Sequence, residues 1–70
     1  MKYYFSLYIS REDFMPYYTG RVSTVVTRAT NGQRVQFPAM YLRKFMTNSG
    51  VKGHFCLETD NNKFISLEKI

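Results

Sequence analysis

Residues 21–37, RVSTVVTRATNGQRVQF, carry the strongest fold signal in this 70-residue chain. The first half is rich in Val and Thr, which favour strands, and Asn31-Gly32 is the dipeptide most typical of a tight hairpin turn. A two-residue turn there pairs Arg28 with Val35. This register predicts two antiparallel strands whose inner face carries Val22, Thr24, Val26, Val35 and Phe37.

The segment before this hairpin predicts a strand and then a short helix. Residues 2–9 alternate between two faces, with Tyr3, Phe5, Leu7 and Ile9 on the inner one and Tyr4, Ser6 and Tyr8 on the outer one. Ser10 then begins a capping box with Asp13. Pro16 removes a backbone donor, so the helix is expected to be short or kinked, and Gly20 is expected to end it.

The segment after the hairpin predicts a second short helix. Pro38 suits the first position of a helix because its missing amide is not needed there. The inward residues of this helix are then Leu42, Phe45 and Met46, and the outward ones are Arg43 and Lys44. Residues 47–50, Thr-Asn-Ser-Gly, are expected to end it.

The last third of the chain predicts a second hairpin, made of residues 51–59 and 63–70. The turn length follows from the register that places apolar residues against apolar residues. A three-residue turn at residues 60–62 sets Leu57 against Ile65, whereas a two-residue turn sets Leu57 against Ser66. We therefore favour the three-residue turn, which also places His54 opposite Glu68 and Cys56 opposite Ser66.

Together these segments predict one α+β domain spanning residues 1–70. The order is β-α-β-β-α-β-β, with a mainly antiparallel five-stranded sheet curled toward a partly open barrel and two short helices over one side or its open ends. A parallel pair across the second helix is an alternative. Six Phe and six Tyr supply the bulk that so short a chain needs for a core.

Composition favours a small, basic, cytoplasmic protein. The formal net charge is +5, which attracts polyanions, although a charge of this size also serves solubility. Cys56 is the only cysteine, as expected in a reducing compartment. Residues 3–9 contain too many polar groups for the apolar region of a signal peptide, and Arg11-Glu12-Asp13 follows them. No apolar stretch approaches the length of a membrane span.

Catalytic and metal-binding patterns are weak in this sequence. His54 is the only histidine, and Cys56 lies two residues further on the same predicted strand face, so a Cys–His pair is conceivable. Activated thiolates usually lie at a helix N-terminus or in an electropositive cleft, and this position offers neither. One Cys and one His do not make a structural zinc site, and no glycine spacing fits a phosphate loop. We expect no enzyme, metal or cofactor.

The outward residues predict a non-catalytic binding module. Single-strand binders combine basic side chains with exposed aromatic rings on which bases stack. The candidate basic and polar residues are Arg21, Arg34, Gln36, Arg43, Lys44 and Lys52, and the candidate stacking residues are Tyr4 and Tyr8. The expected partner is nucleic acid, another polyanion or an acidic protein. The alternative is an adaptor or homodimer acting through a sheet edge, and an enzyme using Cys56 and His54 ranks third.

A series of short blocks recurs in a known order along nearly the whole chain: Tyr4-Phe5-Ser6-Leu7, Phe14, Tyr17-Tyr18, Gly20, Gly32, Arg34 to Ala39, Leu42-Arg43, Phe45, Thr47, Gly50, Gly53, Phe55, Leu57, Phe64 and Ser66-Leu67. In these blocks the chain resembles the family known as domain of unknown function 2835, short gammaproteobacterial proteins of about this length. The resemblance implies a free-standing bacterial cytosolic protein. It implies no activity, cofactor or site residue.

Overall fold

Seven elements follow the predicted order in a computed structural model that describes residues 1–70. They are β1 (Lys2–Ile9), α1 (Arg11–Tyr18), β2 (Thr24–Arg28), β3 (Arg34–Pro38), η1 (Ala39–Phe45), β4 (Val51–Asp60) and β5 (Lys63–Lys69). The second helix, η1, is a 3-10 helix that follows Pro38. The α+β class and the two short helices are confirmed.

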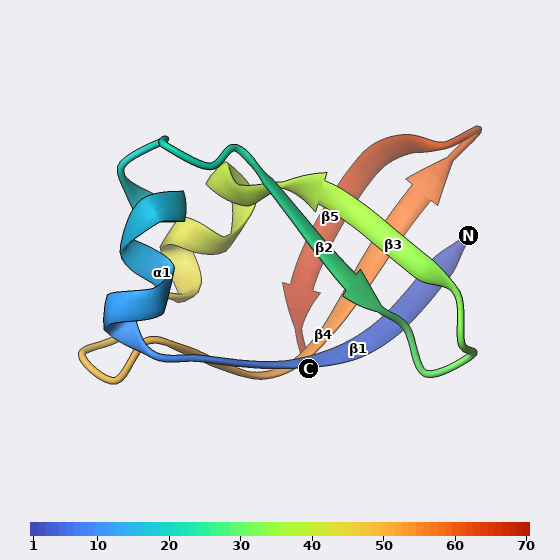
Figure 1. Cartoon of the computed structure of the whole chain (residues 1–70). Helices are drawn as coiled ribbons and strands as arrows, with labels where there is room; N and C mark the ends of the chain where they lie inside the picture. Colours follow the sequence, from blue (N-terminus) through green and yellow to red (C-terminus); the bar gives the residue numbers. More distant parts are fainter.

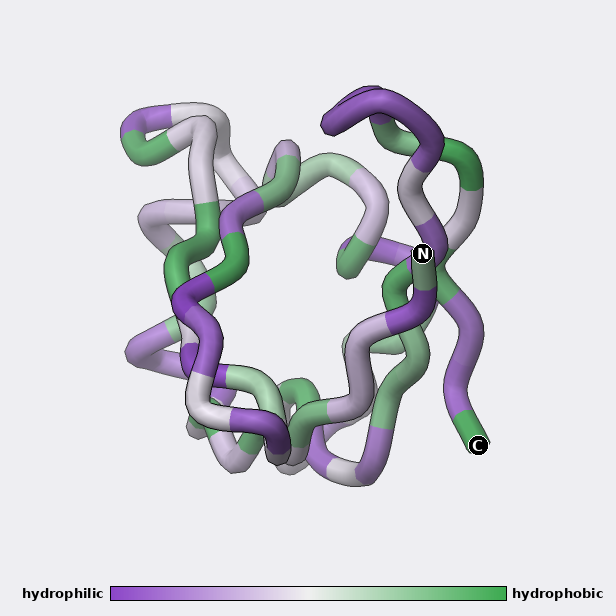
Figure 2. The backbone as a smooth tube through the Cα atoms, turned by 90° about the vertical axis from the view of Figure 1, so that its right-hand side faces the viewer, coloured by the Kyte–Doolittle hydropathy of each residue, from purple (hydrophilic) through white to green (hydrophobic).

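The strands form two sheets, so the prediction of a single five-stranded sheet is wrong. One sheet has the order β1-β4-β5 and the other is the β2-β3 hairpin, and every strand pair is antiparallel. The hairpin crosses the larger sheet instead of extending it (Figure 1). Its only backbone bond to β1 runs from the Thr30 amide to the Tyr4 carbonyl, 2.7 Å. The strands therefore surround a common centre without closing a barrel (Figure 2).

Aromatic rings join the two sheets at the core. Phe5 of β1 stacks on Phe37 of β3 at 5.6 Å and on Phe55 of β4 at 5.9 Å, and Phe45 of η1 meets Phe55 edge-on at 5.2 Å. Such pairs contribute about 0.5–1.5 kcal/mol beyond their buried area. The core holds thirteen buried hydrophobic residues and no buried polar one.

Both helices lie at one end of the molecule, beside each other (Figure 1). The hydroxyl of Ser10 accepts the amide hydrogen of Asp13 at 3.1 Å, which confirms Ser10 as the N-cap, while the return bond of a capping box, from the Ser10 amide to the Asp13 carboxylate, is not formed. Phe14 is fully buried, and Pro16 lies inside this eight-residue helix. Leu42 of η1 is fully buried while Arg43 and Lys44 are exposed, as predicted.

The register of the β2-β3 hairpin differs from the prediction by one residue. Arg28 pairs with Arg34 rather than with Val35. The loop has three residues because Ala29 pairs with Gln33 through a 2.8 Å backbone bond, and Gly32 takes a positive φ of 88° while Asn31 does not. A two-residue type I′ turn needs positive φ at both central residues. The shift buries Val25 and exposes the residues that were expected inside, Val22, Thr24 and Val26.

The β4-β5 hairpin also departs from the prediction, in the opposite direction. Its turn has two residues, Asn61 and Asn62, with φ of 51° and 64°. A register shift between Glu58 and Thr59 leaves Ile65 unpaired and sets Leu57 against Leu67. A regular two-residue turn would have set Leu57 against Ser66. The bulge moves β5 by one residue, so that Leu57 lies opposite an apolar residue again. The predicted pairs change as well, since Cys56 now lies opposite Glu68 and Ser66 opposite Glu58.

Candidate nucleic-acid interface

The outer face of β1 and β4 carries both predicted stacking residues. Tyr4 is 44% exposed and Tyr8 is 71% exposed. They are four residues apart on one strand, hence about 13 Å apart. Tyr8 lies directly opposite Lys52, so the structure brings these two predicted residues together.

Between the tyrosines lies His54, whose Nδ1 is 2.6 Å from the Ser6 hydroxyl. His54 therefore contacts Ser6 of β1. The expected register had placed it opposite Glu68 instead. Cys56 is half-buried and lies between Tyr4 and Glu68 in the sheet. No three His, Cys, Asp or Glu side chains lie close enough together to hold a metal ion.

The outer face of the β2-β3 hairpin carries two arginines at directly opposed positions. Arg34 and Gln36 are exposed, as predicted, and Arg28 lies opposite Arg34. One guanidinium nitrogen of Arg28 donates to the Gly32 carbonyl at 2.8 Å, which holds that group near the turn. Like charges directly opposite each other destabilise a strand pair. Arg28 and Arg34 are called the arginine pair below.

Sequence reasoning missed Arg28 because it assumed a two-residue turn. With that turn Arg28 lies opposite Val35 and faces the core. The same Asn-Gly dipeptide also fits a three-residue loop with Gly in the left-handed position. That loop puts Ala29 inside and Arg28 outside, so weighing both loops would have placed Arg28 among the candidates.

The turn next to the arginine pair is attached to β1. The Thr30 amide binds the Tyr4 carbonyl, which places the turn end of the hairpin, where Arg28 and Arg34 lie, next to this part of β1. Phe5 and Phe37 fix the inner sides of both elements because they stack on each other. The side chains that alternate with them therefore lie on the outer side. Tyr4 thus lies on the outer face of the larger sheet and the arginine pair on the outer face of the hairpin, while Tyr3, on the other side of β1, shares a shallow groove with Arg34.

The remaining predicted residues lie in separate places. Arg43 lies 5.9 Å from the centre of the Tyr18 ring and lines a groove between α1 and η1 that also contains Arg11. Lys44 lies 5.0 Å from the ring centre of Phe45, and Arg21 is exposed in the connection from α1 to β2. The predicted residues therefore form several groups and not one continuous basic surface.

Charge is distributed unevenly along the chain. No Asp or Glu occurs between Asp13 and Glu58, whereas this interval contains Arg21, Arg28, Arg34, Arg43, Lys44 and Lys52. The β2-β3 hairpin therefore has no carboxylate of its own to neutralise the arginine pair.

Comparison with known proteins identifies the family. The chain belongs to the family described as protein of unknown function (DUF2835), whose profile matches residues 1–70, the whole chain. This confirms the resemblance seen in the sequence. Comparison with curated proteins and with solved structures finds no match. None of the helices has the length and apolar character that crossing a bilayer requires.

Proposed function

Because family membership brings no activity with it, we propose that this protein is a non-catalytic module that binds single-stranded nucleic acid. The observation that carries the proposal is the pair of exposed rings on β1, Tyr4 and Tyr8, together with the arginine pair on the hairpin whose turn is bonded to the Tyr4 carbonyl. Arginine binds phosphate through a planar fork of donors, and an exposed ring stacks on a base whatever its sequence. The two kinds of contact that single-strand binding needs therefore lie on β1 and on the hairpin attached to it.

A second contact point lies further along β1. Tyr8 is the more exposed of the two tyrosines, and Lys52 lies opposite it. The separation of about 13 Å between the two rings lets each stack on a different base of an extended strand. A single strand that crosses this face meets Lys52 beside Tyr8.

A single strand fits this surface better than a duplex. Bases in a duplex are already stacked on each other, so exposed rings have nothing to stack on there. The first turn of α1 contains Glu12 and Asp13, which oppose the approach of a phosphate backbone to that helix. α1 therefore does not suit entry into a major groove.

The homodimer alternative receives less support. The free edge of the larger sheet is β5, which contains a bulge and has Lys63 and Lys69 near its ends. Bulges and lysines are the features with which proteins protect sheet edges from each other. Antiparallel pairing of two β5 strands about Ser66 also sets Lys63 of each copy against Lys69 of the other.

The test is binding of fluorescent oligothymidine and oligouridine of about 12 nucleotides, a length within the usual site size, followed by anisotropy. Replacing the arginine pair with serines is expected to weaken binding about tenfold or more. It should also reduce the slope of log affinity against log salt by about 1.4, because two phosphate contacts are lost.

The matched control is Arg11→Ser with Arg43→Ser, which removes the same charge from the groove between α1 and η1. This variant is expected to bind within about threefold of the parent. Equal losses in the two variants would show that net charge, and not the surface beside Tyr4, drives binding. That result would contradict the proposal, as would failure of the parent to bind either oligonucleotide.

A further inference from the structure

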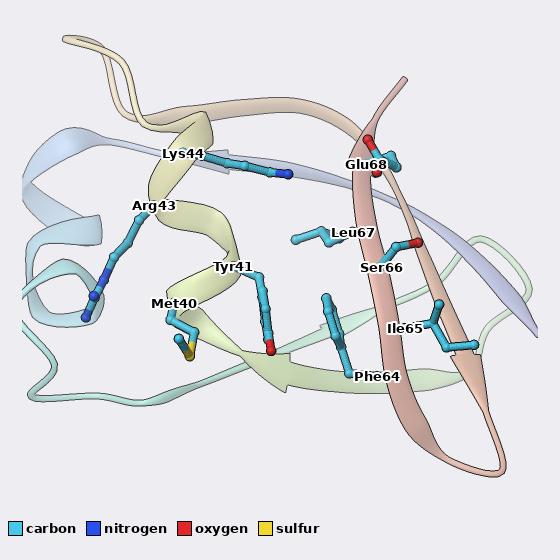
Figure 3. A pocket seen from close by; sticks show the side chains of 9 residues that line it. All are labelled: Met40, Tyr41, Arg43, Lys44, Phe64, Ile65, Ser66, Leu67 and Glu68. Carbon is cyan, nitrogen blue, oxygen red and sulfur yellow. The ribbon is translucent and has the colours of Figure 1, made fainter.

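A groove of about 420 Å³ lies between η1 and β5. Its η1 wall includes Met40, Tyr41 and Lys44, and its other wall is the continuous run Phe64–Glu68 of β5 (Figure 3). Side chains of a strand alternate between two faces. A groove lined by consecutive residues of one strand therefore follows the edge of that strand and not one of its faces.

The backbone of β5 has free hydrogen-bonding groups along this edge. β5 is the last strand in the order β1-β4-β5. The Ile70 amide donates to the His54 carbonyl at 2.9 Å. This bond fixes which residues of β5 direct their backbone amide and carbonyl groups toward β4. In an antiparallel pair these residues alternate with residues that point away. The amide and carbonyl groups of Leu67 and Lys69 consequently point away from β4, toward the open side.

The groove has an apolar part and a basic part. The rings of Tyr41 and Phe64 stack at 3.8 Å with an angle of 12° between them, and Met40 beside them is 59% exposed. Lys44 extends from η1 toward β5, while Arg43 turns away from it (Figure 3). A side chain entering the groove thus meets an apolar surface next to one ammonium group.

The charges along this edge select the occupant. Lys44 lines the groove, Lys63 begins β5 and Lys69 ends it with its side chain over Gly53 of β4, and Glu68 is the only carboxylate on β5. A second copy of β5 brings its own lysines to these positions, which is unfavourable. An acidic segment is complementary to them, and an extended one makes hydrogen bonds with the free groups of Leu67 and Lys69.

We propose that the groove between η1 and β5 is a docking site for an extended, acidic peptide segment of a partner protein. The segment adds a strand to β5, places an apolar side chain on Tyr41 and Phe64, and directs a carboxylate toward Lys44. This site is separate from the surface around Tyr4, and it holds or fails independently of nucleic-acid binding.

The test uses the full chain labelled with ¹⁵N and a synthetic peptide with a valine-rich centre flanked by glutamates. Binding is expected to slow hydrogen exchange of the Leu67 and Lys69 amides by about tenfold or more, because each gains a carbonyl partner. The Glu68 amide, which already faces β4, serves as the internal control. A peptide with N-methylated valines, which lacks the donors for strand addition, is expected to bind about tenfold more weakly.

Charge is tested with Lys44→Glu and with Lys2→Glu, a matched change on β1. Lys44→Glu is expected to weaken the acidic peptide about tenfold, and Lys2→Glu by less than about twofold. Absence of binding at millimolar peptide would overturn the proposal, and so would equal binding of a lysine-flanked peptide. Protection of Leu67 and Lys69 that rises with protein concentration, without peptide, would assign the edge to a second copy and would also overturn it.

Discussion

The β2-β3 and β4-β5 hairpins both turn at asparagine, yet they differ in loop length and in the charges that they expose. The first has a three-residue loop with Gly32 at positive φ, and it carries the arginine pair without any carboxylate. The second has a two-residue turn with both Asn61 and Asn62 at positive φ and a bulge behind it, and it carries three acids as well as three lysines. Loop length sets which side chains face outward, so a change of one residue decides whether a hairpin presents a basic surface.

The largest effect is expected at Leu67 of the second hairpin. Leu67 is buried while Ile65 is 52% exposed because the bulge leaves it unpaired. Leu67→Ala is expected to lower the free energy of unfolding by about 2–5 kcal/mol, and Ile65→Ala by about 0.5 kcal/mol or less. Urea denaturation measures both. Similar losses at the two positions would mean that the regular register, without a bulge, is the correct one.

A smaller effect at Val25 tests the first hairpin. Val25 is buried, and its neighbour Val26 is 47% exposed. Val25→Ala should destabilise the protein by about 2 kcal/mol, whereas Val26→Ala should change stability by no more than about 0.5 kcal/mol. A larger loss of stability for Val26→Ala than for Val25→Ala, in thermal or urea unfolding, would support the two-residue turn. In that register Arg28 faces the core.

Gly32 tests the loop itself. A Cβ at this position meets no atom within 4 Å, but φ is 88°. Gly32→Ala is therefore expected to lose about 1–2 kcal/mol from backbone strain alone. Gly20→Ala, also at positive φ in open space, is the comparison outside the hairpin. A neutral Gly32→Ala variant in urea denaturation would show that the loop does not need this conformation.

The smallest effect is expected at the turn of the second hairpin. Asn61 and Asn62 already take left-handed conformations, which asparagine tolerates better than most residues. Asn62→Gly should change stability by about 0.5 kcal/mol or less, because the lower strain in the turn is offset by greater freedom in the unfolded chain. A loss above about 1 kcal/mol in the same denaturation assay would argue against a turn with both asparagines at positive φ.

Local patterns predicted much of this fold. The two-residue period placed Phe5 and Leu7 inside and Tyr4 and Tyr8 outside, and the serine and aspartate spacing predicted the cap of α1. These features depend only on neighbouring residues. The turn lengths were not predictable in the same way, because Asn-Gly and Asn-Asn each suit more than one loop, and a bulge leaves no clear mark in the sequence.

The candidate site depends on contacts between distant parts of the chain. Tyr8 and Lys52 were each expected to face outward, but their proximity required the pairing of β1 with β4. The attachment of the hairpin turn to β1 at Tyr4 required one hydrogen bond between Thr30 and β1, which no periodicity reveals. The division into two sheets has the same origin, since pattern alone does not say whether the short hairpin extends the larger sheet or crosses it.

The most direct test of the nucleic-acid surface is titration of the ¹⁵N-labelled protein with oligothymidine, followed by amide chemical shifts. The largest changes are expected at Tyr4, Arg28, Thr30 and Arg34, with smaller ones at Tyr8 and Lys52. Changes concentrated at Arg11 and Arg43, or spread evenly over all exposed lysines and arginines, would contradict a binding surface formed by Tyr4 and the arginine pair.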